Sequence, residues 1–325
     1  MSRHNTKVSI AKTDLRVTRL GLGTAPLGGL FTSVLESDSD ELIRSAFEND
    51  LNFFDTAPLY GHGTAEIRLG RILKSMGKPF VLETKVGRVL NPTANADKAW
   101  FADANPLLEP VFDFSADGVK RSIEESLKRL GVDHIDIALL HDADDHLDQA
   151  IREGYPVLDD YRRQGIIKGV GMGLNLCAPS ITIMKECDLN IALIAGRFTL
   201  LDQEAQEELF PLALKKNVSI LAAGVYNSGV LANPNPGATF NYLPASEEVI
   251  TRARAIGKFL KARNVSLTAA ALQFPLRHPA VTVVLTGSRS KAELESNIAD
   301  FNRELPEDIW EELEDSGLIQ PLRVN

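Results

Sequence analysis

Short apolar runs alternate with amphipathic stretches along almost the whole chain. The runs are rich in Val, Ile, Leu and Phe, the composition of buried strands. Between them, apolar residues recur at the spacing of helices, and several of these stretches stop at a glycine such as Gly77, Gly131 or Gly165. We expect strands at 19–23, 51–55, 80–84, 135–140, 166–172, 191–195, 218–222 and 281–285. We expect helices at 39–49, 65–76, 115–130, 148–164, 178–186, 204–216, 247–263, 267–277, 292–298 and 306–316.

This alternation predicts an α/β fold, a single (α/β)8 TIM barrel that occupies residues 1–325 as one domain. No linker rich in Ser or Pro divides the chain. Ahead of the first strand, residues 8–10 and 15–17 flank a turn and predict an N-terminal β-hairpin. A doubly wound sheet would also fit the alternation. That fold usually has fewer strands, and no glycine-rich dinucleotide fingerprint follows the first strand here.

Composition narrows the class of protein. The 325 residues are 44% hydrophobic and 24% charged, which is ordinary for a soluble enzyme. A net charge of −9 without a long Lys/Arg cluster argues against nucleic-acid and anionic-membrane partners. Cys177 and Cys187 lack CxxC spacing, which argues against a disulfide framework or structural zinc, and no apolar run is long enough to span a bilayer. We therefore expect a cytoplasmic enzyme for a small molecule, as a monomer or homo-oligomer.

Polar residues follow several of the predicted strands. In the barrel, chemistry takes place where strands end and the next loops begin. Asp55 ends the second strand, Lys85 follows the third, His141 follows the fourth and Asn175 lies just past the fifth. We expect these side chains to face one mouth of the barrel, with Tyr60 five residues beyond Asp55. Taken alone, residues 51–60 fit a structural role as well as a catalytic one, with Asp55 as the cap of a turn and Tyr60 as an aromatic residue of a loop.

The set has a coherent chemistry. Lys85 beside Tyr60 would favour tyrosinate and lower the pKa of the phenol, and Asp55 would pair with Lys85 and hold it in place. His141 would hydrogen-bond a substrate oxygen or relay a proton. These roles predict proton transfer to and from a substrate.

Several motifs resemble those of aldo-keto reductases. They occur in order from about Leu20 to Asn297, and each lies at a predicted strand end or helix. Within the family, the likeness is closest to the bacterial aldose 1-dehydrogenase group of D-threo-aldose, L-fucose and L-galactose dehydrogenases, with pyridoxal 4-dehydrogenase nearby. The motifs are residues 21–28 (GLGTAPLG), 54–61 (FDTAPLYG), 66–70 (EIRLG), 84–88 (TKVGR), 121–131 (RSIEESLKRLG), 139–142 (LLHD), 195–201 (AGRFTLL) and 227–231 (NSGVL).

The resemblance implies a barrel that binds extended NAD(P) without a Rossmann domain. It maps a catalytic tetrad onto Asp55, Tyr60, Lys85 and His141. In reduction, Tyr60 would give a proton to the carbonyl oxygen while the nicotinamide delivers hydride, and in oxidation tyrosinate would take the hydroxyl proton. His141 would orient the same oxygen.

The resemblance also implies a set of cofactor contacts. Asn175 matches the residue that holds the nicotinamide carboxamide, whereas Ala195 and Ala223 replace a Gln and a stacking Tyr of many members. Tyr226 is near enough in sequence to compensate for the missing stack. Ser288 would donate to phosphate and Asn297 would contact adenine. The full set that we expect to bind cofactor is Gly23, Thr24, Asp55, Asn175, Tyr226, Gly287, Ser288, Arg289, Glu293 and Asn297.

The residues around the expected ribose favour NAD over NADP. Glu293 stands where the family often has an Arg for the 2′-phosphate, and Gly287 stands where it often has a Lys. A carboxylate accepts a hydrogen bond from a ribose hydroxyl and repels a phosphate. Arg289 is the counter-argument, because its guanidinium could still reach a 2′-phosphate.

Three further stretches carry less specific signals. Residues 141–146 (HDADDH) contain His and Asp, which are common metal ligands, but we interpret this stretch as a solvated acidic loop and expect no metal site. Residues 169–173 (GVGMG) read as a closely packed barrel strand rather than a phosphate loop. The long segment 89–114 is read as a loop that forms a lid or pocket wall, and Trp100 and Phe101 within it are expected to contact substrate together with His141.

Two classes of function remain. The first is an NAD(P)-dependent oxidoreductase, which would oxidise an aldose to its lactone or, in the other direction, reduce a sugar aldehyde or other carbonyl compound. The second is a cofactor-binding barrel with a regulatory or structural role and no turnover. The complete tetrad favours catalysis.

Overall fold

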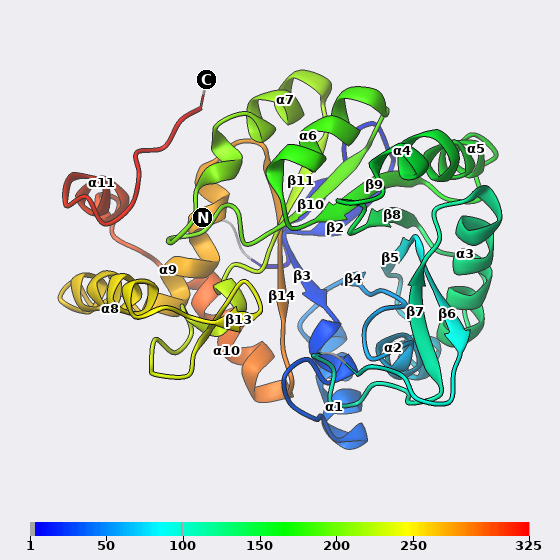
Figure 1. Cartoon of the computed structure of the whole chain (residues 1–325). Coiled ribbons are helices and arrows are strands. Elements are labelled where there is room, and N and C mark those ends of the chain that lie inside the picture. Colours follow the sequence, from blue (N-terminus) through cyan, green and yellow to red (C-terminus); the bar gives the residue numbers. More distant parts are fainter. Residues whose placement is uncertain (1–3, 99, 325) are drawn as a thin grey trace.

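Eight parallel strands form a closed barrel in the computed structural model, which describes residues 4–98 and 100–324. Figure 1 shows these strands in the middle of the molecule, with the helices around them. The predicted (α/β)8 barrel is confirmed. In order around the barrel the strands are β3 (Leu20–Gly23), β4 (Phe53–Asp55), β5 (Val81–Val86), β8 (Ile137–His141), β9 (Gly169–Leu174), β10 (Ile191–Ala195), β11 (Ser219–Ala223) and β14 (Val281–Gly287).

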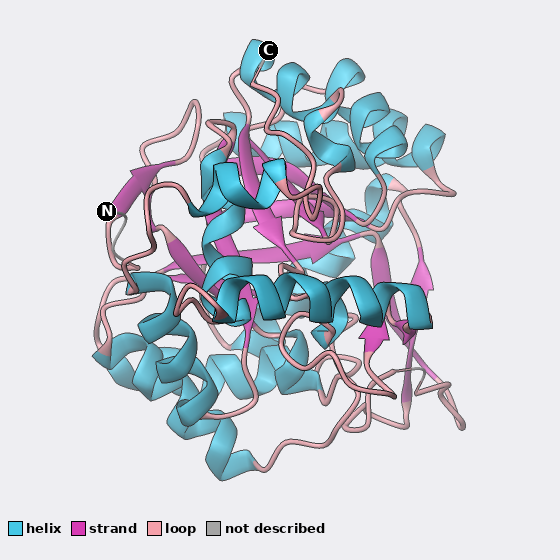
Figure 2. Cartoon of the chain, turned by 90° about the vertical axis from the view of Figure 1, so that its left-hand side faces the viewer, coloured by secondary structure: helices cyan, strands magenta, loops and turns pink. Residues whose placement is uncertain are grey.

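The helices cover the outside of the barrel, as the view in Figure 2 also shows. No helix among the described residues is both long and apolar enough to cross a bilayer. The α-helices are α1 (Glu36–Glu48), α2 (Thr64–Met76), α3 (Ala116–Leu130), α4 (Leu147–Gln149), α5 (Tyr155–Arg163), α6 (Cys177–Glu186), α7 (Leu209–Lys216), α8 (Glu247–Lys261), α9 (Leu267–Gln273), α10 (Lys291–Asn302) and α11 (Ile309–Asp315). Short helical turns are η1 (Ala25–Gly28), η2 (Ala150–Gly154), η3 (Glu204–Gln206), η4 (Asn227–Gly229) and η5 (Phe274–Arg277).

Two helices predicted as continuous are interrupted at prolines. The stretch 148–164 consists of α4, the π-helical turn η2 and α5, and Pro156 lies in the first turn of α5. The stretch 267–277 changes from α9 to the 3₁₀ turn η5 next to Pro275. A proline lacks the backbone N–H of a regular helix and clashes with the preceding turn, so a change of helix type relieves the mismatch.

The N-terminal hairpin closes one end of the barrel. Strand β1 (Lys7–Ser9) pairs antiparallel with β2 (Arg16–Thr18), which confirms the predicted hairpin. Its apolar residues Ile10, Leu15 and Val17 belong to one buried cluster with the interior-facing side chains of the barrel strands. Ala11 N–H donates to the hydroxyl of Ser219, the first residue of β11. The hairpin therefore seals the end where strands begin and leaves the other end for chemistry.

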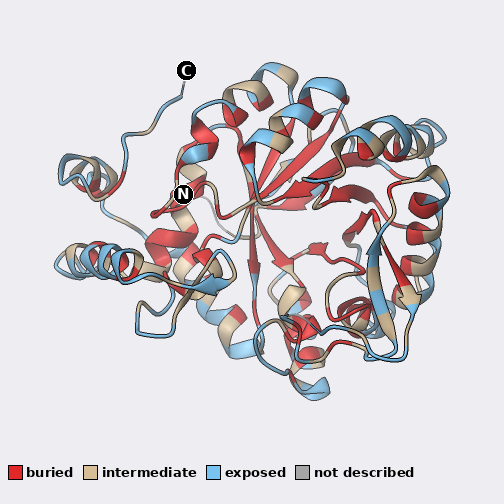
Figure 3. Cartoon of the chain, in the orientation of Figure 1, coloured by how far each residue is buried: buried red, intermediate tan, exposed pale blue. Residues whose placement is uncertain are grey.

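Glycines on β3 and β9 leave room inside the barrel. A Cβ at Gly21 would lie 2.6 Å from Leu285 and 2.8 Å from Phe53, and a Cβ at Gly173 would lie 3.4 Å from the Lys85 side chain. Residues 169–173 are thus part of a buried strand, as we predicted, and Figure 3 shows the barrel strands as the buried centre of the molecule.

Two small hairpins stand over the open end. Strand β6 (Arg88–Pro92) pairs with β7 (Leu108–Phe112), and β12 (Thr239–Phe240) pairs with β13 (Leu243–Pro244). The first corrects the reading of 89–114 as a loop. The two-residue turn of the second has positive φ at Asn241 (50°) and Tyr242 (64°), the combination of a type I′ turn, in which glycine is the usual second residue. A bulky side chain is rare there and indicates that the surroundings hold it in place.

Candidate active site

A buried ion pair lies at the open end of the barrel. Asp55 ends β4, and Lys85 lies on the neighbouring strand β5. The Lys85 ammonium donates to a carboxylate oxygen of Asp55 and, at 2.9 Å, to the backbone carbonyl of Thr56. Asp55 is 4% exposed and Lys85 1%. Two charges are stable at such depth only when they are paired and hydrogen-bonded.

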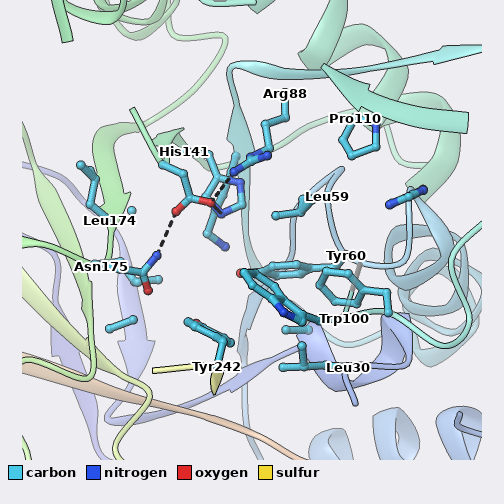
Figure 4. A pocket seen from close by; sticks show the side chains of 18 of the residues that line it. Leu30, Leu59, Tyr60, Arg88, Trp100, Pro110, His141, Leu174, Asn175 and Tyr242 are labelled. Atoms are coloured by element: carbon cyan, nitrogen blue, oxygen red, sulfur yellow. Dashed lines mark hydrogen bonds and ion pairs between the residues drawn. The ribbon is translucent and has the colours of Figure 1, made fainter. Parts of the chain in front are cut away.

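Tyr60 and His141 complete the predicted set. The Lys85 ammonium lies 4.8 Å from the centre of the Tyr60 ring. The Tyr60 and His141 rings are perpendicular, with centres 5.9 Å apart, and Figure 4 shows both at the same cavity. The Tyr60 ring also packs against Phe101, 6.1 Å between centres. The structure therefore brings together Asp55, Tyr60, Lys85 and His141 as expected.

Burial, rather than Lys85, decides the proton affinity of Tyr60. Burial raises the pKa of Tyr60 above its ordinary value, although the positive charge of Lys85 opposes the rise. Burial also disfavours the Lys85 ammonium, but its acidic surroundings outweigh this effect, with the charge and hydrogen bond of Asp55 foremost, and raise the pKa of Lys85. Lys85 thus acts on the pKa of Tyr60 in the expected direction, but burial outweighs it and the pKa is raised overall. Asp55 already compensates the charge of Lys85, so a neutral phenol faces the cavity.

His141 is held as a neutral imidazole. Burial lowers its pKa to about 3, and the positive charges of Lys85 and Arg88 act in the same direction against the opposing effect of Asp142. Its Nδ1 atom is buried and has no hydrogen-bond partner among the described residues. A neutral imidazole can donate one hydrogen bond to a substrate oxygen without carrying a charge into the cavity.

The cavity in front of Tyr60 has a volume of 540 Å³. Trp100 and Tyr242 form an aromatic wall, with ring centres 5.2 Å apart and planes inclined by 17°. Trp100 remains 48% exposed, whereas Phe101 is buried at 4% and reaches the cavity beside Tyr60. All three expected substrate contacts, Trp100, Phe101 and His141, line the cavity, and the hairpin of β6 and β7 adds Arg88, Glu109 and Pro110 to its wall.

Opposite the aromatic wall lies a polar network. Arg88 donates to Asp142 at 3.0 Å, and the Asn175 amide donates to the other oxygen of Asp142 at 3.1 Å, as the dashed lines of Figure 4 indicate. The Arg88 guanidinium also lies 4.0 Å from the centre of the Phe112 ring. Asp142 thereby fixes both Arg88 and Asn175. The sequence analysis does not predict Arg88, Asp142 or Tyr242 as site residues. Arg88 and Asp142 are nevertheless the last residues of two of the family motifs, 84–88 and 139–142.

A second cavity of 490 Å³ adjoins the first. The residues that line both are Ala25, Leu30, Tyr60, Leu193, Ala195 and Tyr242. Most of the expected cofactor contacts line this groove. Asn175 instead lines the substrate cavity, and Thr24 is buried next to the groove with a hydroxyl that has no partner among the described residues. The predicted cofactor contacts that line the groove are Gly23, Asp55, Tyr226, Gly287, Ser288, Arg289, Glu293 and Asn297.

Side chains at the far end of the groove bind one another. Glu293 accepts hydrogen bonds from the Arg289 guanidinium at 2.5 and 3.0 Å and from its backbone N–H at 2.8 Å. The Asn297 amide donates to Ser288 at 3.1 Å and accepts from the Tyr226 phenol at 2.8 Å. Tyr226 is therefore tied to Asn297, the residue expected at the adenine. A groove that begins at Tyr60 and ends at hydroxyl, amide and guanidinium groups fits an extended dinucleotide.

The stretch 141–146 has no metal-binding geometry. Among residues 4–98 and 100–324, no group of three or more His, Cys, Asp or Glu side chains is placed to hold a metal ion. His146 instead packs against Phe112, 4.4 Å between ring centres.

Comparisons with known proteins agree with this geometry. The sequence profile of the aldo/keto reductase family matches residues 19–317. The chain belongs to this family. It is 38% identical to pyridoxal 4-dehydrogenase of Microbacterium luteolum over 96% of this chain and 98% of that one. It is 34% identical to D-threo-aldose 1-dehydrogenase of a Pseudomonas species, covering 97% and 98%. An aldo-keto reductase of Bacillus halodurans solved in its holo form has the same fold, with a TM-score of 0.77, 23% identity and 99% and 98% coverage.

Family membership makes the chain an oxidoreductase that uses a nicotinamide cofactor. The relatives fall in the expected aldose dehydrogenase group, which also includes an L-galactose dehydrogenase of Arabidopsis thaliana, 30% identical over 90% of this chain and 86% of that one. The reading as an enzyme is therefore confirmed, and a barrel without turnover is not favoured.

We expect His141 to stay neutral throughout the physiological range. Because its folded pKa of about 3 lies below its ordinary 6.5, its contribution to stability is present above pH 6.5 and is lost as the pH falls towards 3. An NMR titration of the imidazole nitrogens, assigned with a His141→Gln variant, should show no protonation of His141 above about pH 5. The His141→Gln variant is also the control, because it should lose this imidazole signal and no other. A His141 midpoint near 6.5 would contradict this picture.

Proposed function

We propose that the protein is an NAD(P)-dependent dehydrogenase that oxidises the anomeric carbon of an aldose to the lactone, with Tyr60 as the acid/base. One observation carries the proposal: the Tyr60 phenol lies over the buried Lys85–Asp55 pair, beside neutral His141, where the substrate cavity meets the cofactor groove. The similarity to D-threo-aldose 1-dehydrogenase supports the substrate class. Reduction of a sugar aldehyde or other carbonyl would use the same groups in reverse, and the similarity to pyridoxal 4-dehydrogenase keeps an aromatic aldehyde or alcohol as a candidate.

Each residue has one task in this mechanism. Tyr60 exchanges one proton with the substrate oxygen. Lys85 stabilises the tyrosinate when that proton has been given away, and Asp55 keeps Lys85 in place and charged. His141 donates a hydrogen bond to the same substrate oxygen. When bound, the nicotinamide supplies the hydride acceptor of oxidation or the donor of reduction. Gly23, Asn175, Ser288 and Asn297 are the residues that we propose hold it, with Thr24, Tyr226, Gly287, Arg289 and Glu293 beside them.

The cavity has the chemistry of a sugar site. Asp142 and Arg88 offer acceptors and donors for hydroxyl groups on one side. Trp100 and Tyr242 offer flat aromatic faces for the C–H bonds of a sugar ring on the other. We propose that this combination selects a polyhydroxylated substrate. As a separate proposal, we place the enzyme in the cytoplasm.

Tyr60→Phe removes the acid/base and leaves the ring. We expect kcat to fall by about 10²–10⁴-fold while cofactor affinity stays unchanged. The measurement is absorbance of the reduced nicotinamide with a panel of aldoses and aldehydes in both directions. Tyr161→Phe on α5, outside both cavities, is the control and should retain activity. Full activity in Tyr60→Phe would remove Tyr60 from the mechanism.

Cofactor preference depends on Glu293 and Arg289. Because Glu293 occupies the Arg289 guanidinium through two hydrogen bonds, we propose that the wild type prefers NAD. Glu293→Arg frees Arg289 and adds a second cation, so we expect kcat/KM for NADP to rise at least about tenfold relative to NAD. In the double variant with Arg289→Ala this gain should shrink. A wild type that prefers NADP would refute the assignment.

Trp100 is expected to contribute binding rather than chemistry. Trp100→Ala should raise KM for the substrate several-fold and change kcat by less than about threefold. Ile166→Ala is a matched control, because Ile166 is 49% exposed and lies outside both cavities. An unchanged KM would exclude Trp100 from substrate contact.

A further inference from the structure

Glu83 is a buried carboxyl inside the barrel that the mechanism above does not use. It lies on β5, two residues before Lys85, and is 0% exposed. Thr84 points outward, where its hydroxyl donates to Glu66 of α2 at 3.0 Å. Since side chains alternate along a strand, Glu83 shares the interior face with Val81 and Lys85, and Val81 belongs to the interior apolar cluster.

Among the described residues, the polar surroundings of Glu83 consist of the Asp55–Lys85 pair. Strand register places Asp55 of β4 on one side of Glu83 and Ile137 of β8 on the other. β8 adds Leu139 to the interior, and β3 and β9 contribute glycines there. The titratable groups that face Glu83 are therefore Asp55 from β4 and Lys85 from its own strand, with Tyr60 and His141 at the mouth beyond Lys85.

Hydrogen bonding shows which form of the carboxyl this position accepts. Neither oxygen of Glu83 receives a hydrogen bond from a donor among the described residues. The Lys85 ammonium is directed at Asp55 and at the Thr56 carbonyl. Two carboxylates and one ammonium would leave an uncompensated negative charge in the barrel, which is prohibitively costly at this depth. One of the two carboxyls must hold a proton, and Asp55 is the one paired with Lys85.

The electrostatics of the site agree with this assignment. Burial and the negative charge of Asp55 raise the pKa of Glu83 well above its usual range, and Lys85 offsets this only in part. Because Asp55 and Glu83 are register partners on adjacent strands, a protonated Glu83 lies beside the Asp55 carboxylate and can donate a hydrogen bond to it.

We propose that Glu83 is a positioning residue: a neutral carboxylic acid that donates a hydrogen bond to Asp55 and thereby determines how much of the Lys85 charge acts on Tyr60. A neutral donor draws negative charge away from Asp55, so the ammonium is less compensated and stabilises tyrosinate more. An ionised Glu83 would do the opposite. The effect on Tyr60 rests on the proposed function, whereas the protonation of Glu83 does not.

Infrared spectroscopy of the full-length protein without substrate tests the protonation. At pH 7 we expect a carbonyl stretch of a protonated carboxylic acid that is present in wild type and absent in Glu83→Gln. Glu66→Gln is the matched control, because Glu66 is equally buried but accepts hydrogen bonds from Thr84 and, at 2.6 Å, from Arg129. This variant should keep the band. A wild type without the band, or a band that disappears in Glu66→Gln only, would overturn the proposal.

The pH profile of oxidation tests the action on Tyr60. Glu83→Gln keeps a neutral donor and should retain the wild-type midpoint of kcat against pH. Glu83→Leu and Glu83→Ala remove the donor, so their midpoint should move up by about one pH unit, with activity restored at higher pH. A merely structural role would lower activity at every pH without moving the midpoint. Equal pH profiles of kcat for Glu83→Gln and Glu83→Leu would refute the action on Tyr60. A wild type that turns over no sugar or aldehyde would refute the proposed function. The infrared result would still stand in that case.

Discussion

A charged amine buried in a barrel has to be matched by a carboxylate, and the open end of this protein is arranged around that requirement. The ammonium of Lys85 is 1% exposed, and its hydrogen bonds to Asp55 and to the Thr56 carbonyl tie β5 to the end of β4. Tyr60 lies in the loop that follows β4, five residues beyond Asp55, and its ring packs against the Lys85–Asp55 pair. The site depends on two adjacent strands being in register at Asp55 and Glu83.

The rest of the fold holds that register. The hairpin seals the opposite end with Ile10, Leu15 and Val17, so the interior near the strand starts is apolar. At the mouth Arg88 and Asp142 compensate each other, as Lys85 and Asp55 do below them. The aromatic pair of Trp100 and Tyr242 then separates the mouth from solvent on one side. Two ion pairs therefore lie one above the other at the open end, Lys85–Asp55 below and Arg88–Asp142 above.

The sequence predicts the parts of this arrangement that follow from strand periodicity. Asp55, Lys85 and His141 were found because a strand end in a barrel points to the mouth, whatever the neighbouring loops do. Tyr242 was missed because its position depends on a turn with two positive φ angles, for which neither Asn241 nor Tyr242 carries the usual glycine signal. The hairpin of β6 and β7 was missed because Pro92, Pro106 and Pro110 mark their segment as a loop. The proton affinity of Tyr60 could not be predicted either, because it depends on how deeply the phenol is buried.

The glycines inside the barrel bear on how such sites are recognised in other sequences. At Gly21 even one methyl group would lie 2.6 Å from Leu285 and 2.8 Å from Phe53, and at Gly171 it would lie 2.3 Å from the Ile191 carbonyl oxygen. These contacts involve strands on both sides of each glycine, so the large interior side chains and the absent ones form a single complementary set. A chain that keeps the four polar residues but carries a larger residue at position 21 would need smaller residues at 53 and 285 in return, and at position 171 the backbone of the next strand would have to move. Glycines at these positions therefore identify this kind of barrel interior in a sequence as well as the charged residues do.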